Sequence, residues 1–124
     1  MGTGRMLVLL DWIYDGAEQR SGNTVTGNRV GTNAAGAAAI PNTGAGISIG
    51  AGSENNVIGG TTAADRNVIS GNTGDGIVLS GAATEGNRID SNYIGLDGTG
   101  TTALPNGGAG IQVAPDAWEN AIGS

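Results

Sequence analysis

The residues best suited to chemistry in this sequence are Arg88, Asp90 and Tyr93. Arg88 and Asp90 flank Ile89 at a spacing of two, which places both side chains on the same outer face of an extended strand. A guanidinium beside a carboxylate on a solvent face is usually a weak surface ion pair. The alternative is a catalytic pair, an arginine base beside an acid, with Tyr93 one strand further along.

Carbohydrate is the ligand that these residue types fit best. Aromatic faces stack on sugar rings, and arginine forks bond to hydroxyl or carboxylate groups. We therefore predict a carbohydrate contact at Tyr93, Arg88 and Arg29. The alternative is that each is a solvated outer position without a ligand. No residue is assigned a catalytic role.

Composition excludes several kinds of site. The chain has no His and no Cys, so histidine catalysis, histidine metal ligation and thiolate metal sites cannot occur. Asp75 and Asp97 are single acids in glycine-rich loops, without the several spaced oxygen ligands that a calcium loop needs. We expect no metal and no cofactor.

Charge and hydropathy limit the partners. The formal net charge of −6 repels phosphate backbones, so we expect no nucleic-acid partner. The apolar run Leu7 to Leu10 is far shorter than the roughly 18 residues of a membrane helix. We expect no membrane insertion and no secretory signal within the given residues.

An internal repeat indicates how these residues are positioned. Residues 11–60 align without a gap on residues 75–124, with 17 of 50 positions identical. Within this 64-residue period a shorter one of about 30–34 residues recurs, each unit holding three short segments in which apolar and polar residues alternate. Such segments, bounded by Gly and Asn, are typical of strands. Equivalent segments one unit apart are expected to pair in parallel as successive coils.

The expected strands fall into three sets. The first contains Trp12–Tyr14, 46–49, 76–79 and 110–113; the second 23–25, 56–58, 87–89 and 120–122; the third 28–30, 67–69 and 92–94. The inward column is predicted to be Ile13, Val25, Val30, Ile47, Ile49, Ile58, Ile69, Ile77, Leu79, Ile89, Ile94, Ile111, Val113 and Ile122. The outward positions are Thr24, Val57, Arg88 and Ala121 on the second strands and Arg29, Val68 and Tyr93 on the third.

Asparagine recurs where these strands begin. Asn tolerates the left-handed backbone of a corner, and its amide can bond to the Asn one coil above. The alternative is that each Asn is a turn former bonded to its own backbone. The predicted structural corners are Asn23, Asn28, Asn56, Asn67, Asn87, Asn92 and Asn120.

These features together predict an all-β fold, a right-handed parallel β-helix of three coils plus a partial fourth. The repeats occupy residues 11–124, and residues 1–10 form either an apolar plug or a fragment boundary. Two longer loops, 31–46 and 95–110, are expected to share one side of the stack. Trp118 is expected to cover the end of the core from a corner loop. A β-helix whose end coil is uncapped continues into neighbouring coils or stacks on another copy.

The segments GNRVGTNAAGAAAIPNTGAGISI and SNYIGLDGTGTTALPNGGAGIQV resemble the right-handed parallel β-helix repeats of large bacterial surface and secreted proteins, which share the pectate-lyase-like fold. The resemblance covers residues 11–124. It implies an extracellular or cell-surface location but not one activity, because such repeats occur both in adhesin-like arrays and beside polysaccharide-cleaving enzymes.

The resemblance leaves two functions to compare. The first is a structural or adhesive segment of an exported bacterial protein with weak carbohydrate binding. The second is a fragment of a polysaccharide lyase or glycoside hydrolase whose active site lies largely outside this chain. Hydrolases of this fold have aspartate clusters and a His-containing motif, which this chain lacks. Lyases use calcium and an arginine base, for which Arg88 and Asp90 are the nearest set.

Overall fold

The chain is built from short parallel strands. The computed structural model describes residues 8–9, 21–50 and 52–123. Its strands are β1 (Val8–Leu9), β2 (Thr24–Val25), β3 (Arg29–Val30), β4 (Ile47–Ile49), β5 (Val57–Gly59), β6 (Val68–Ile69), β7 (Ile77–Leu79), β8 (Arg88–Asp90), β9 (Tyr93–Ile94), β10 (Ile111–Val113) and β11 (Ala121–Ile122). From β2 onward, each coincides with a segment that the sequence predicts to be extended, and β5 and β8 run one residue further, to Gly59 and Asp90.

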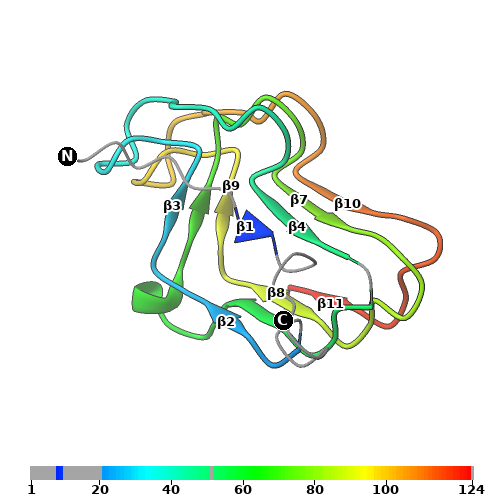
Figure 1. Ribbon diagram of the computed structural model, residues 1–124. Helices are drawn as coiled ribbons and strands as arrows, with labels where there is room; N and C mark the ends of the chain where they lie inside the picture. The colour runs from blue at the N-terminus through cyan, green and yellow to red at the C-terminus, as the bar shows by residue number, and fades with distance from the viewer. Residues whose placement is uncertain (1–7, 10–20, 51, 124) are drawn as a thin grey trace.

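Three parallel sheets form the three sides of the coils (Figure 1). Sheet A has the order β1-β4-β7-β10, sheet B the order β11-β8-β5-β2 and sheet C the order β3-β6-β9. The register follows the repeat: Ile47 pairs with Ile77, and Ile77 pairs with Ile111. The predicted parallel β-helix of three coils and part of a fourth is therefore confirmed.

The first coil begins differently from the prediction. The expected strand at Trp12–Tyr14, with inward Ile13, lies outside the described residues. The strand that pairs with β4 is β1, in which Val8 lies opposite Ile47 and Leu9 opposite Ser48. Residues 8–9 therefore extend sheet A.

The core is a narrow aliphatic column inside the three sheets. Eight of the residues predicted to point inward are buried, namely Val30, Ile47, Ile49, Ile58, Ile69, Ile77, Leu79 and Ile89. Val25, Ile94 and Ile111 pack against this column and are partly buried. Val113 and Ile122 continue the inward column in register with Leu79 and Ile89, but they are 43% and 50% exposed. Both belong to the fourth coil, where no described coil lies above them.

Two asparagine ladders connect the coils along the corners. The first runs from Asn23 through Asn56 and Asn87 to Asn120, with Nδ2-to-Oδ1 distances of 2.9–3.0 Å. The second runs from Asn28 through Asn67 to Asn92. Each of these Oδ1 atoms also accepts a hydrogen bond from the backbone N–H of the Asn one coil earlier. For example, Asn56 N–H donates to Asn87 Oδ1 at 3.0 Å. The predicted ladder is confirmed over the alternative of isolated turn formers. The left-handed backbone expected of these asparagines lies instead on the preceding residue, as at Asn55, Ser91 and Glu119.

A third ladder was not predicted from the sequence. Asn42 donates through Nδ2 to Asn72 Oδ1, and Asn72 donates to Asn106 Oδ1, both at 2.9 Å. The 64-residue repeat pairs Asn42 with Asn106, but Asn72 is in a short connection without the Pro-Asn motif. Its place in the ladder follows from the stacking of the coils.

The 64-residue period arises from alternating connections between sheets C and A. The first and third coils carry the long loops 31–46 and 95–110, whereas the second has only residues 70–76. Each long loop begins with a tight hairpin, closed by the bridge between Thr32 and Ala39 or between Leu96 and Ala103. The hairpins meet across the second coil, where Gly98 N–H donates to Gly36 O at 2.9 Å. The prediction that the loops share one side is confirmed.

The described helical structure is the short 3-10 helix η2 (Ala63–Asp65), in the longer connection between β5 and β6. The Asp65 carboxylate accepts hydrogen bonds from the hydroxyl and backbone N–H of Thr62 at 3.0 and 3.3 Å, which fixes the start of the turn. No helix in the described part of the chain is long and apolar enough to cross a membrane.

Candidate functional site

The outer face of sheet C consists of Arg29, Val68 and Tyr93, which lie side by side in register on β3, β6 and β9. Val68 was expected at a solvated outer position, but it is only 2% exposed. The hairpins of the first and third coils come together on this side, and a Cβ at Gly36 would approach Arg29 while one at Gly100 would overlap the Tyr93 ring. The hairpins therefore lie against Arg29 and Tyr93, the two neighbours of Val68 on this face.

Tyr93 is held by an arginine that the sequence analysis did not select. The Arg66 guanidinium lies 4.2 Å from the centre of the Tyr93 ring, in a cation–π arrangement. Arg66 also donates to the Tyr93 hydroxyl at 3.0 Å and to the Ser91 carbonyl at 3.2 Å. Arg66 follows η2 in a loop and belongs to no strand, so the alternation of residues along strands could not identify it. Only the stacking of the second coil on the third brings it to Tyr93.

Arg29 occupies the other end of the same face. Its Nε is buried and has no hydrogen-bond partner among the described residues. A guanidinium nitrogen in this condition is unusual, because buried donors are normally paired. The Arg29 Nε is therefore an unsatisfied donor that its surroundings shield from solvent.

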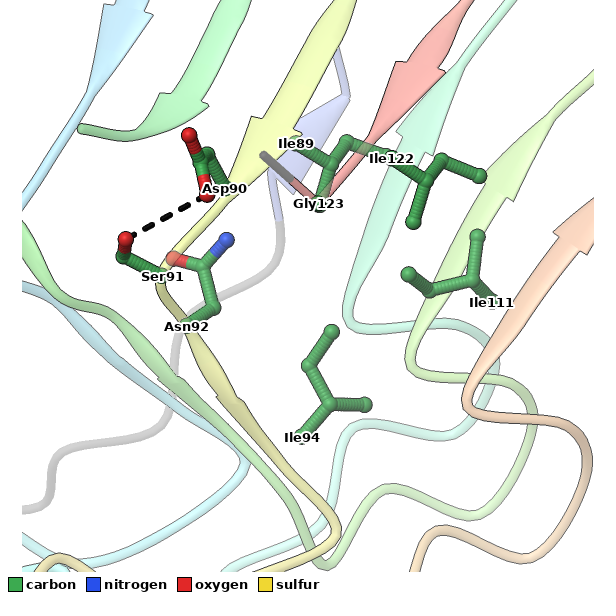
Figure 2. Close-up of a pocket in the computed structure, with 8 residues that line it drawn as sticks. All are labelled: Ile89, Asp90, Ser91, Asn92, Ile94, Ile111, Ile122 and Gly123. Carbon is green, nitrogen blue, oxygen red and sulfur yellow. Dashed lines mark hydrogen bonds between the residues drawn. The ribbon is translucent and has the colours of Figure 1, made fainter. Parts of the chain in front are cut away.

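Arg88 lies on sheet B and not on the outer face of sheet C. Its guanidinium is 3.4 Å from Asp90 Oδ2, so the predicted ion pair is formed, with the Arg88 side chain 53% exposed and that of Asp90 6% exposed. The expectation that both side chains emerge into solvent is wrong for Asp90, which lies at the corner between sheets B and C. The second Asp90 oxygen accepts a 3.3 Å bond from the Ser91 hydroxyl (Figure 2).

The other acids that were considered for calcium form internal hydrogen bonds. Asp75 Oδ1 accepts the backbone N–H of Ala109 at 2.6 Å, one coil later. Asp97 Oδ1 accepts bonds from the Thr99 hydroxyl and the backbone N–H groups of Thr99 and Gly100. The Thr99 hydroxyl bond is the main reason why the pKa of Asp97 is lowered from 3.8. The described residues contain no group of three or more metal-ligating side chains.

Trp118 does not cover the core as expected. It is 51% exposed. Its backbone forms a parallel bridge with Glu85, which forms the same bridge with Glu54 one coil earlier. Its neighbour Ala117 packs against the core cluster instead. The large ring is therefore an exposed apolar surface at the last corner.

Comparison of the chain with models of protein families, with curated proteins and with solved structures gives no match. Its classification therefore depends on the strand order, the register and the ladders. The chain is a parallel β-helix. The predicted contact residues divide into two groups on this scaffold: Tyr93 and Arg29 on the outer face of sheet C, and Arg88 on sheet B.

Proposed function

We propose that this chain is a structural or adhesive β-helix segment of an exported bacterial protein, and that its outer surface contacts carbohydrate weakly. The neighbours of such a segment are further coils of the same type or another copy of the stack. The sugar-contacting groups are Tyr93 with Arg66, together with Arg29 and Arg88.

The distribution of positive charge carries this proposal. The chain has a net charge of −6, yet the three arginines among the described residues, Arg29, Arg66 and Arg88, all lie on the outer side of sheets B and C. Arginine forks suit hydroxyl and carboxylate groups of sugars. The side-chain amides of the ladder asparagines, in contrast, bond to one another inside the stack, which supports a structural role for these residues.

Affinity electrophoresis through gels that contain neutral or acidic polysaccharides tests the contact. We expect a neutral polysaccharide to retard the purified chain more than an acidic one, because the net charge of −6 repels polyanions. Arg66→Ala and Arg88→Ala should each weaken retention severalfold. Thr24→Ala is the matched control, because Thr24 is an exposed outward residue of sheet B without charge. Equal retention of all four proteins would contradict the assignment of the arginines.

Turnover separates the structural role from the enzymatic alternative. The Arg88–Asp90 pair is the feature that favours the alternative, since it places a guanidinium beside a nearly buried carboxylate. We expect no reducing sugar and no unsaturated product when the polysaccharides are incubated with the chain, with or without calcium. Product that appears with the chain and disappears with Arg88→Ala would overturn the structural assignment.

A further inference from the structure

Asn106 is the one asparagine of the sequence that is followed by glycine. In an Asn-Gly pair the backbone nitrogen of the glycine can attack the side-chain amide carbon of the asparagine, because glycine has no Cβ to hinder the approach. Asparagine is among the thermolabile residues of proteins. Asn106–Gly107 is therefore the pair at which this chain is expected to react with itself first.

The fold requires both residues of this pair. Asn106 is a member of the third ladder, in which its Oδ1 accepts a hydrogen bond from Asn72 Nδ2 at 2.9 Å. A Cβ at position 107 would overlap the carbonyl oxygen of Thr73, one coil earlier. Asn42 and Asn72, the other members of the ladder, are each followed by Thr, whose branched side chain hinders the same attack. The stacking of the coils therefore places a reactive pair at one position of the ladder.

The same ladder holds both reacting groups in hydrogen bonds. The Gly107 N–H donates to Asn72 O at 2.8 Å. The Asn106 amide is held at both of its atoms, since Oδ1 also accepts the backbone N–H of Asn72 at 3.0 Å and Nδ2 donates to Ile69 O at 3.1 Å. Attack requires the Gly107 N–H to give up its proton and the amide to turn toward the nitrogen. These bonds must break first, so the closed ladder inhibits the reaction.

We propose that Asn106–Gly107 is a self-modification site that reacts when the third ladder opens locally. In the open state the Gly107 nitrogen loses its proton to solvent and bonds to Asn106 Cγ, the Cγ–Nδ2 bond breaks, and Nδ2 leaves as ammonia with that proton. Water is the second reactant, and it opens the resulting cyclic imide at one of its two carbonyl groups. The product is aspartate or isoaspartate at position 106, without any oxidation or reduction. The site is independent of carbohydrate binding.

The product cannot restore the ladder. A carboxylate at position 106 has no hydrogen to donate to Ile69 O, and it places negative charge beside that carbonyl oxygen. Isoaspartate also adds a methylene group to the main chain, which displaces the Gly107 N–H from Asn72 O. When opening is faster than chemistry, the rate of a reaction at an opened site follows the population of the open form. The modified fraction therefore records how often this ladder has opened.

Peptide mapping of the full chain tests the proposal. Cleavage after the arginines separates residues 67–88 from residues 89–124, and fragmentation in the mass spectrometer locates the change from amide to acid at Asn72 or Asn106. At mildly alkaline pH, we expect Asn106 to convert at least about tenfold faster in the chain unfolded by guanidinium chloride than in the folded chain. In the unfolded chain Asn106 should also convert faster than Asn72.

Two variants separate the ladder from the stability of the whole stack. Asn72→Ala removes one donor to Asn106 Oδ1 and the acceptor of the Asn42 amide, so conversion of Asn106 in the folded chain should rise about tenfold. Asn87→Ala is the matched control, because it makes the same change in the middle of the first ladder. It should leave the rate within about twofold of the parent, since the two ladders share no residue. Circular dichroism checks that both variants are folded.

Hydrogen exchange provides a second measurement on the unmodified chain, which does not depend on the folding of a variant. The Gly107 amide should be slowed in the folded chain, relative to the unfolded chain, by the same factor as the conversion of Asn106, because both processes need the same opening.

Three results would overturn the proposal. One is conversion of Asn106 at the same rate in the folded and the unfolded chain. Another is equal acceleration by Asn72→Ala and Asn87→Ala, which would show that unfolding of the whole stack controls the reaction. The third is a Gly107 amide that exchanges as in the unfolded chain while Asn106 stays unconverted.

Discussion

Equivalent side chains of the third and fourth coils differ in burial and in hydrogen bonding. Ile89 of the third coil is 2% exposed, whereas Ile122, its partner in the fourth coil, is 50% exposed. Asn87 is 1% exposed and bonded on both sides, whereas the described bonds of Asn120 are all to earlier residues. The difference teaches that a coil of this fold is completed by the coil above it, and that one repeat alone does not bury its own apolar residues.

The largest effect is expected from truncating the two isoleucines. Ile89→Ala should lower the free energy of unfolding by about 3–4 kcal/mol, because it leaves a cavity between packed coils. Ile122→Ala should cost less than about 1.5 kcal/mol, since its side chain is already half in water. Urea unfolding followed by circular dichroism measures both. Equal losses would show that the last coil is packed as tightly as the third.

The glycine corners give the next test. Gly59 and Gly123 are equivalent in the 64-residue repeat, and both have positive φ, 99° and 84°. A Cβ at Gly59 would overlap the carbonyl oxygen of Asp90 in the next coil, but one at Gly123 would meet nothing within 4 Å. We expect Gly59→Ala to cost about 3 kcal/mol and Gly123→Ala about 1 kcal/mol, the latter from backbone strain alone.

Thermal unfolding of both glycine variants checks this difference. A loss for Gly123→Ala as large as that for Gly59→Ala would mean that backbone conformation, and not the approach of the next coil, sets the requirement for glycine.

The asparagine ladder should show a smaller contrast. Asn87→Ala removes the Oδ1 that accepts two bonds from Asn56 and leaves those donors buried, so we expect a loss of about 2 kcal/mol. Asn120→Ala removes the equivalent bonds at the open end, where water can replace them, and should cost about 1 kcal/mol or less. Hydrogen exchange of the Asn56 backbone amide provides a local readout: it should accelerate in Asn87→Ala and remain slow in Asn120→Ala.

The smallest effect is expected at the two hairpins, 32–39 and 96–103, which are capped by different residues. Asn33 accepts the backbone N–H groups of Ala37 and Ala38, whereas Asp97 caps the second hairpin as a carboxylate. Because the folded pKa of Asp97 lies below 3.8, its contribution to stability is present above that pH and is lost as pH falls through the folded pKa. The hairpin that Asn33 caps has no such dependence.

An NMR titration of the Asp97 carboxyl carbon should therefore give a midpoint below 3.8, and Asp97→Asn should remove the acid sensitivity of its hairpin. A midpoint at or above 3.8 would contradict the capping role.

The order and spacing of short apolar segments determined most of the fold. In an extended strand alternate residues face opposite sides, so the positions of Ile47, Ile77 and Ile111 were sufficient to predict the parallel register. The recurring Asn before each second and third strand likewise predicted two ladders, because residues at equivalent positions in successive coils must stack.

The tertiary structure decided what lies against the outward residues. Alternation places Val68 on the outside of its strand, yet it is 2% exposed. The hairpins that lie against its neighbours Arg29 and Tyr93 meet at Gly36 and Gly98, which are 62 residues apart. The same holds for Arg66 on Tyr93 and for Asn72 in the third ladder, which depend on how connections of unequal length stack. Periodicity determines which side of a strand a residue faces, whereas burial and pairing depend on non-local contacts that only the assembled coils provide.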